Sequence, residues 1–190
     1  MPRSAQSYPG YFFLVPEVYG QMGPATKFDH RKQPPVVERL EYVFDSFPAD
    51  PMFTTSPCYL AFASLVKAFE QSKLSGFSTA PVTVKKADQY HLISGRKRLP
   101  ETKMLVITGI AGRDDFGLLY DCKLVLSSAA LAIAKQHGLS RCRCYDATIP
   151  PTRDAITRDV WKDAQKFADE VKEKRKNGRR ASWLGDLLKQ

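Results

Sequence analysis

The chain lacks the long apolar run of a membrane-spanning helix, because no segment approaches the roughly 18 apolar residues that such a helix needs. The first residues, Met1–Gln6, also contain no long apolar stretch, so we expect no signal peptide. Cysteine is scarce, with 4 residues in a chain of 190. These features favour a cytoplasmic protein with reduced thiols over a membrane protein or a secreted domain built on disulfides.

Recognisable catalytic and nucleotide-binding motifs are also missing. The sequence has no phosphate-binding loop, no dinucleotide fingerprint and no HExxH pattern. Cys142 and Cys144 form a CxC pair, but a zinc site usually needs a second pair or nearby histidines, and His30, His91 and His137 are scattered. We therefore expect no metal, no cofactor and no catalysis, although a catalytic triad need not be local in the sequence.

Positive charge is abundant, since 29 Lys and Arg residues against 20 Asp and Glu give a net charge of +9. This charge permits a nucleic acid, an anionic membrane surface or an acidic protein as partner, and it selects none of them. The segment Thr152–Gln190 carries 11 of the bases and 7 of the acids, so the excess is spread along the chain. A hydrophobic fraction of 43% is typical of a globular protein.

Periodicity and turn residues predict strands and helices in an irregular order. A helix begins at Ser56-Pro57 and runs to Lys73, and a second helix covers Ala129–His137 with Ser127 or Ser128 as its N-cap. Tyr90–Ile93 extends or pairs with the strand before it. The predicted strands are Tyr11–Val15, Val36–Asp45, Ala80–Lys86, Met104–Ile110, Leu118–Leu126 and Arg141–Thr148.

This order predicts an α+β fold, with a mixed or antiparallel sheet of about six strands, two packed helices and a C-terminal helical extension. Residues 1–149 form the globular domain and residues 150–190 the charged extension, with a helix over Arg153–Lys176. Three surfaces are candidates for docking the apolar end Trp183–Leu188: the core of the same chain, a second copy of the protein in a homodimer, and a membrane. We favour its own core, because two turns are weak for membrane binding.

The segment Gly112–Gly117 places two adjacent carboxylates, a base and an aromatic ring between two glycines. Polar and aromatic groups on a loop between strands are typical of a functional surface. We expect Arg113, Asp114, Asp115 and Phe116 to contact a partner protein. Two alternatives stay open: a solvated turn whose carboxylates cap backbone amides, and a metal or catalytic site, for which further spaced carboxylates are missing nearby.

Basic residues around Tyr90 and His91 suggest a nucleic-acid surface, because bases interleaved with aromatic rings can follow a phosphate backbone. A solvated hairpin end is the alternative. The acids interleaved with the bases of segment 172–176 likewise favour a solvated helix face. The nucleic-acid hypothesis uses Lys85, Lys86, Arg96, Lys97, Arg98, Arg179 and Arg180.

Several short motifs follow one another along residues 11–147: Tyr11–Val18, Gly20 with Gly23, Pro34–Val37, Leu40–Asp45, Phe53–Tyr59, Gly112–Gly117 and Leu124–Ser127. In this order the chain resembles a group of uncharacterised bacterial proteins that are similar to the immunity proteins of polymorphic-toxin systems. The resemblance implies a small cytoplasmic protein that binds one cognate toxin and blocks it by steric occlusion and charge complementarity. A basic inhibitor suits an acidic toxin, and fits a nuclease less well because nuclease active sites are usually basic.

The sequence therefore predicts a bacterial protein that binds and neutralises a partner protein, with contacts centred on the Arg113–Phe116 loop and the Gly20–Pro35 loop. A basic nucleic-acid-binding protein is one alternative. An enzyme of unknown class, using Asp114 or Asp115 with a distant histidine, is the other.

Overall fold

The structure, a computed structural model, describes residues 7–29, 31, 36–119 and 122–148, together with residues 158, 159, 162, 165, 166, 169 and 173. Its strands are β1 (Tyr11–Val15), β2 (Gly20–Met22), β3 (Lys27–Asp29), β4 (Val36–Phe44), β5 (Met52–Thr55), β6 (Cys58–Phe62), β7 (Phe77–Lys86), β8 (Thr102–Ile107), β9 (Phe116–Leu118), β10 (Leu124–Ser127) and β11 (Arg143–Asp146). Its helices are α1 (Ala63–Gln71), α2 (Tyr90–Ser94) and α3 (Ser128–Gln136).

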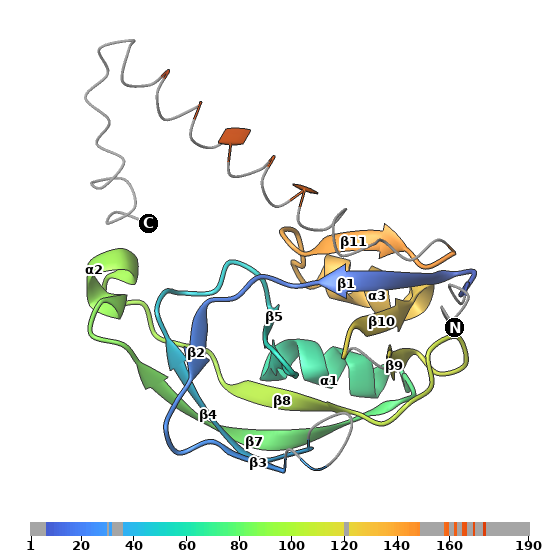
Figure 1. Ribbon diagram of the computed structural model, residues 1–190, viewed down its shortest axis with the longest axis horizontal. Coiled ribbons are helices and arrows are strands. Elements are labelled where there is room, and N and C mark those ends of the chain that lie inside the picture. The colour runs from blue at the N-terminus through green and yellow to red at the C-terminus, as the bar shows by residue number, and fades with distance from the viewer. Residues whose placement is uncertain are drawn as a thin grey trace.

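A seven-stranded sheet forms one half of the molecule, with the strand order β2-β4-β7-β8-β6-β5 and with β3 also paired to β4 (Figure 1). Its neighbouring strands are antiparallel except β4 and β7, which run parallel with Leu40 opposite Val82. The sheet curls until its outer strands approach each other. There, the Thr54 N–H donates a hydrogen bond of 3.0 Å to the Glu17 carbonyl, just before β2.

Aromatic rings fill much of the interior of this sheet. Tyr42, Phe44 and Phe53 are fully buried, and their ring centroids lie between 4.6 and 5.6 Å apart. Such spacings are typical of favourable aromatic pairs. Leu40, Tyr42 and Phe44 share the inward face of β4 because alternate residues of a strand point the same way. This alternation predicted the strand Val36–Asp45, which is confirmed as β4.

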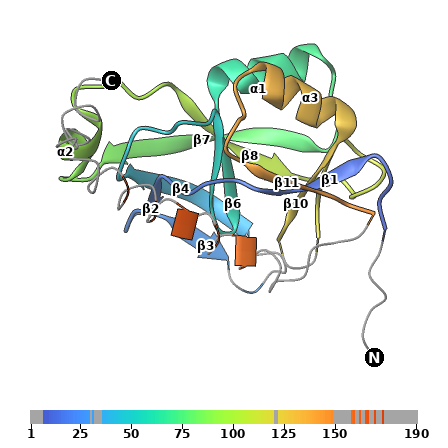
Figure 2. The same cartoon turned by 90° about the horizontal axis from the view of Figure 1, so that it is seen from above.

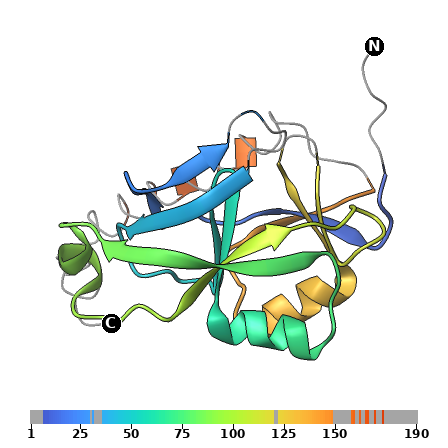
Figure 3. The ribbon, with the colours of Figure 1, turned by 90° about the horizontal axis from the view of Figure 1, so that it is seen from below.

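Four strands, in the order β11-β1-β10-β9, form a second, antiparallel sheet. Helix α3 packs against β1 and β10, helix α1 packs against β6 and β8, and the two helices lie side by side (Figures 2 and 3). Leu65 and Phe69 of α1 share a core with Leu131 of α3. The Ser127 hydroxyl caps α3 by accepting a hydrogen bond from the Ala130 N–H, so the predicted start of this helix is confirmed.

The prediction of an α+β fold with about six strands and two packed helices is wrong. The described residues from 7 to 148 are mainly β, with eleven strands in two sheets and three helices. Strands β2, β3, β5 and β9 have only three or four residues each, so they show too little alternation for periodicity to reveal them. Two of them, β2 and β3, lie in the Gly20–Pro35 segment that was predicted as a loop.

Three predicted elements also differ from the structure. The helix predicted to begin at Pro57 begins at Ala63, because Cys58–Phe62 forms the strand β6. Most of β6 is buried, and a short run buried on both faces cannot be told from a buried helix by periodicity. Tyr90–Ile93 lies in helix α2 instead of continuing the preceding strand. The single strand predicted over Leu118–Leu126 is split between β9 and β10.

The division into a domain of residues 1–149 and an extension of residues 150–190 stays a prediction. The described residues between 158 and 173 are helical, and the Tyr145 hydroxyl of β11 donates a hydrogen bond of 2.9 Å to Asp159 Oδ2. Arg179, Arg180 and the apolar end Trp183–Leu188 lie outside the described residues. Among the helices that the structure describes, none has the length and apolar character needed to span a membrane.

Candidate partner-binding surface

The Arg113–Phe116 loop is held in place by hydrogen bonds within the protein. Asp114 Oδ2 accepts a hydrogen bond of 2.8 Å from the Ile110 N–H and pairs with Arg113 at 3.1 Å. The Ile110 amide and the Arg113 guanidinium together hold the pKa of Asp114 below its ordinary value. The Arg113 side chain is 69% exposed and that of Asp114 only 20%, so Arg113 is the more accessible of the two.

Asp115 joins the loop to both packed helices. One carboxylate oxygen accepts from the Ser75 N–H at 2.9 Å and from the Ser75 hydroxyl at 3.1 Å, and the other accepts from the Ser127 hydroxyl at 2.6 Å. Burial by itself would raise the pKa of Asp115, but the hydrogen bonds from Ser127 and Ser75 outweigh it and lower the pKa. Ser75 follows α1 and Ser127 caps α3, so this carboxylate has a structural role.

Phe116, the aromatic residue of the loop, lies in the core. Its ring centroid is 5.0 Å from that of Phe69 and 4.6 Å from that of Phe77, and the residue is fully buried. The loop passes so close to Gly76 that a Cβ atom there would collide with the Phe116 carbonyl. The Phe116 ring is therefore inaccessible to a partner in this structure, and a partner contact at the loop stays a prediction that Arg113 would have to carry.

The basic residues expected to bind nucleic acid are partly engaged with the protein itself. Lys85 forms an ion pair of 2.7 Å with the buried Glu41, and this contact lowers the pKa of Glu41. Lys86 Nζ donates a hydrogen bond of 2.9 Å to the Lys97 carbonyl and lies 4.4 Å from the centre of the Tyr90 ring. These contacts hold the end of β7 against the turn that follows α2.

Helix α2 is anchored by its inward side. Tyr90 and Ser94, four residues apart and therefore on one face of the helix, are both buried. The Ser94 hydroxyl accepts a hydrogen bond of 2.7 Å from the Phe47 N–H, and the Tyr90 hydroxyl donates one of 3.2 Å to the Lys97 carbonyl. Gly95 ends the helix with a φ of +60°, a conformation that favours glycine.

The outward side of α2 presents apolar side chains to solvent. Leu92 is 74% exposed and Ile93 is 42% exposed. Four exposed bases come from the segments that enter and leave the helix. The helix lies at the end of the molecule opposite the four-stranded sheet (Figure 1). We call these residues the α2 surface: Lys86, Leu92, Ile93, Arg96, Lys97 and Arg98.

Among the described residues, Cys142 and Cys144 form a thiol pair on strand β11 and the segment just before it. The Cys142 thiol donates a hydrogen bond of 3.6 Å to the Arg143 carbonyl, and the Cys144 thiol donates one of 3.5 Å to the Cys142 carbonyl. The interaction between the two neighbouring side chains raises the pKa of Cys142 and lowers that of Cys144. Within the part of the chain that the structure describes, no group of three or more His, Cys, Asp and Glu side chains could hold a metal ion.

Leu92 and Ile93 were not among the predicted site residues. Their signal in the sequence is a pair of apolar residues beside a basic turn, and the prediction of a strand over Tyr90–Ile93 obscures it. No protein-family model matches the chain, and no curated protein matches it. The arrangement of its own residues therefore carries the functional conclusion.

Proposed function

We propose that the protein binds an acidic partner protein through the α2 surface and neutralises it without catalysing a reaction. The observation that carries the proposal is the exposure of Leu92 and Ile93 beside four bases at one end of the molecule. Exposed apolar residues rimmed by polar ones are typical of protein-interaction sites. The bases favour an acidic partner, because complementary charge speeds encounter and suppresses binding to wrong partners.

The proposal includes the immunity-like role that the sequence resemblance implies, in the cytoplasm of a bacterium. An inhibitor of this kind covers the functional region of its target, so it needs a protruding contact surface that is already ordered. Tyr90 and Ser94 hold α2 from its inward side and leave the outward side free. Such preorganisation raises affinity because little conformational entropy is lost on binding.

A nucleic acid is the second candidate partner, because five bases lie near α2 in the sequence. Two observations weigh against it. Tyr90 is fully buried, so its ring cannot stack on a nucleotide base, and Lys85 is already paired with Glu41. The apolar side chains of Leu92 and Ile93 would also gain nothing from contact with a charged phosphate backbone.

A pull-down of the tagged full-length protein from its native host, with and without nuclease, tests this function. Leu92→Asp is the test variant, and Ile110→Asp is the matched control because Ile110 is 55% exposed in the loop between β8 and β9, far from α2 (Figure 1). We expect the wild-type protein and Ile110→Asp to capture the same stoichiometric protein after nuclease treatment. Leu92→Asp should lose it, because an added charge disrupts an apolar contact.

Neutralisation is tested with the captured protein itself. We expect the captured protein to inhibit growth when it is expressed alone. Co-expression of the wild-type chain or of Ile110→Asp should restore growth, and co-expression of Leu92→Asp should not. Retention of the partner by Leu92→Asp would contradict the role of the α2 surface. A complex that vanishes with nuclease would instead support the nucleic-acid candidate.

A further inference from the structure

A cavity of about 140 Å³ lies where strand β6 begins and strand β8 ends. Residues of four strands line it, together with Pro57 from the turn before β6. They include Val37 of β4, Cys58 of β6, Met104, Val106 and Ile107 of β8, and Leu118 of β9. The cavity therefore touches both sheets.

The cavity follows from an uneven distribution of side-chain volume along the seven-stranded sheet. Near α2, the interior is filled by large rings such as Tyr42 and Phe44. At the other end of β4, beyond an irregularity in its pairing with β3, the smaller Val37 packs against the same core and is only partly buried. Strand β6 pairs with β8 only from Thr102 to Leu105, so Val106 continues beyond the pairing and leaves a gap beside it.

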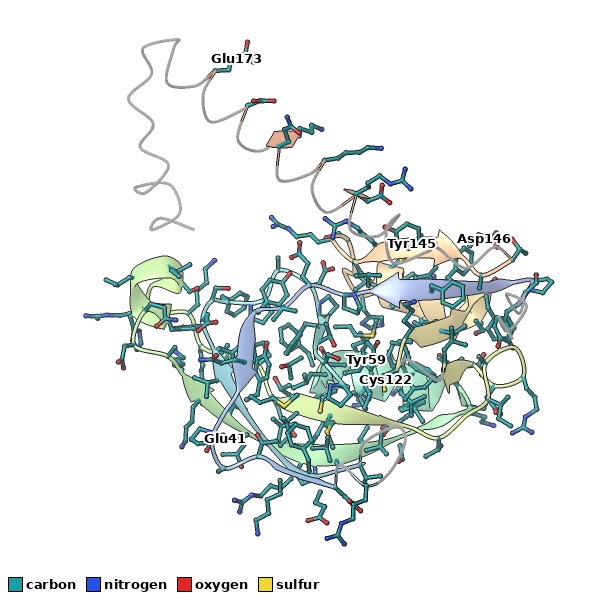
Figure 4. All side chains as sticks on the ribbon, viewed as in Figure 1. Glu41, Tyr59, Cys122, Tyr145, Asp146 and Glu173 are labelled. Carbon is teal, nitrogen blue, oxygen red and sulfur yellow. The ribbon has the colours of Figure 1, made fainter. Side chains whose placement is uncertain are left out.

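The chemistry of the described lining residues disfavours a charged occupant. None of the described lining residues carries a charge. Burial raises the pKa of the Cys58 thiol to about 12, so the thiol is neutral at physiological pH. The Tyr59 hydroxyl is already engaged, since it donates to the Cys122 carbonyl at 2.9 Å and accepts from the Leu124 N–H at 3.0 Å (Figure 4). An occupant with a charge would therefore lose part of its hydration without gaining a charged partner among these residues.

We propose that this cavity binds a small, uncharged, apolar molecule. An apolar cavity of about 150 Å³ accepts benzene or xenon, so a volume of about 140 Å³ suits an occupant of about six non-hydrogen atoms. Strand β4 runs from Val37 at the cavity to Phe44 near α2, so the ligand and the partner protein bind at different ends of the molecule. The proposal does not rest on the function of the α2 surface.

Methyl NMR of the full chain, titrated with benzene, tests the site because the methionines supply an internal control. Met104 lines the cavity, whereas Met22 and Met52 are not among its lining residues. We expect the Met104 methyl signal to shift and saturate with benzene while the signals of Met22 and Met52 stay in place. Benzoate, of similar width but charged, should leave all three signals unchanged.

Val106→Phe fills the cavity and should abolish the Met104 shift. If that variant fails to fold, Leu118→Phe fills the same space from β9. A Met104 signal that does not respond up to the solubility limit of benzene would overturn the proposal. So would an equal response of all three methionines, an equal response to benzoate, or an unchanged response in a folded, filled variant.

Discussion

Asp50→Ala is expected to lower the free energy of unfolding by about 3–5 kcal/mol. Asp50 is fully buried in the turn before β5. Its carboxylate accepts hydrogen bonds from the backbone N–H groups of Ser140, Arg141 and Cys142 at 2.8 to 3.0 Å, and from the Ser140 hydroxyl at 3.1 Å. One side chain therefore connects the turn before β5 to a segment about 90 positions later, just before β11.

The magnitude follows from the number of donors and their exposure. A hydrogen bond to a charged group contributes about 1.5–3 kcal/mol, and a buried donor left without an acceptor costs about 1–3 kcal/mol. Water can reach part of the freed donors, because Ser140 and Arg141 are exposed and Cys142 is half-buried. We therefore expect a loss of stability well below the sum of these contributions over all the hydrogen bonds. Asp50→Asn keeps one acceptor oxygen and should lose about 1.5–3 kcal/mol.

Urea denaturation followed by far-UV circular dichroism measures these differences. Asp88→Ala is the control, because Asp88 is exposed and substitutions at such positions usually change stability by less than about 0.5 kcal/mol. The expected order of stability is wild type and Asp88→Ala, then Asp50→Asn, then Asp50→Ala. A loss below about 1 kcal/mol for Asp50→Ala would refute the structural role assigned to this carboxylate.

Three further predictions follow from the contacts above. Leu92→Ala should weaken partner binding about tenfold, as measured by titration calorimetry, because Leu92 is 74% exposed and its truncation removes about 1.5 kcal/mol of apolar burial in the complex. An unchanged affinity would contradict a contact between Leu92 and the partner. Because the folded-state pKa of Asp115 is lowered, its contribution to stability is complete above its unfolded pKa of about 3.9 and is lost as the pH falls through the folded pKa. The difference in unfolding free energy between wild type and Asp115→Asn should therefore be constant from about pH 5 to 7 and shrink below about pH 4. An undiminished difference at lower pH would contradict a stabilising role of the ionised Asp115 carboxylate. Gly76→Ala should destabilise the protein more than Gly138→Ala in the same denaturation assay, because both have positive φ but only Gly76 is in close contact with other atoms; equal losses would argue against that contact.

Asp115 shows why the acidic loop was expected to be functional. Two adjacent carboxylates on a loop between strands have no visible partner in the sequence, so they suggest an external one. In the folded chain, Asp115 meets Ser75, 40 positions earlier, and Ser127, 12 positions later. Sequence spacing contains no information on these contacts, because they depend on how α1 and α3 are brought together.

Local signals in the sequence did predict several elements. Tyr11–Val15 forms β1, the alternating apolar residues of Val36–Asp45 form β4, and Ser127 caps α3. Each of these depends on residues within a few positions of one another. Cys58–Phe62 is the contrary case, because its strand character depends on pairing with β5 and β8, on both sides of it.

The sequence by itself determined the positive charge, the longer alternating strands, the cap of α3 and the basic turn around Arg96–Arg98. Only the tertiary structure decided which of these groups face solvent. It buries Tyr90 and Phe116, engages Asp114 and Asp115 within the protein, and leaves Leu92 exposed beside the bases. The physical reason is that charge and periodicity are properties of neighbouring residues, whereas burial depends on contacts between segments far apart in the chain.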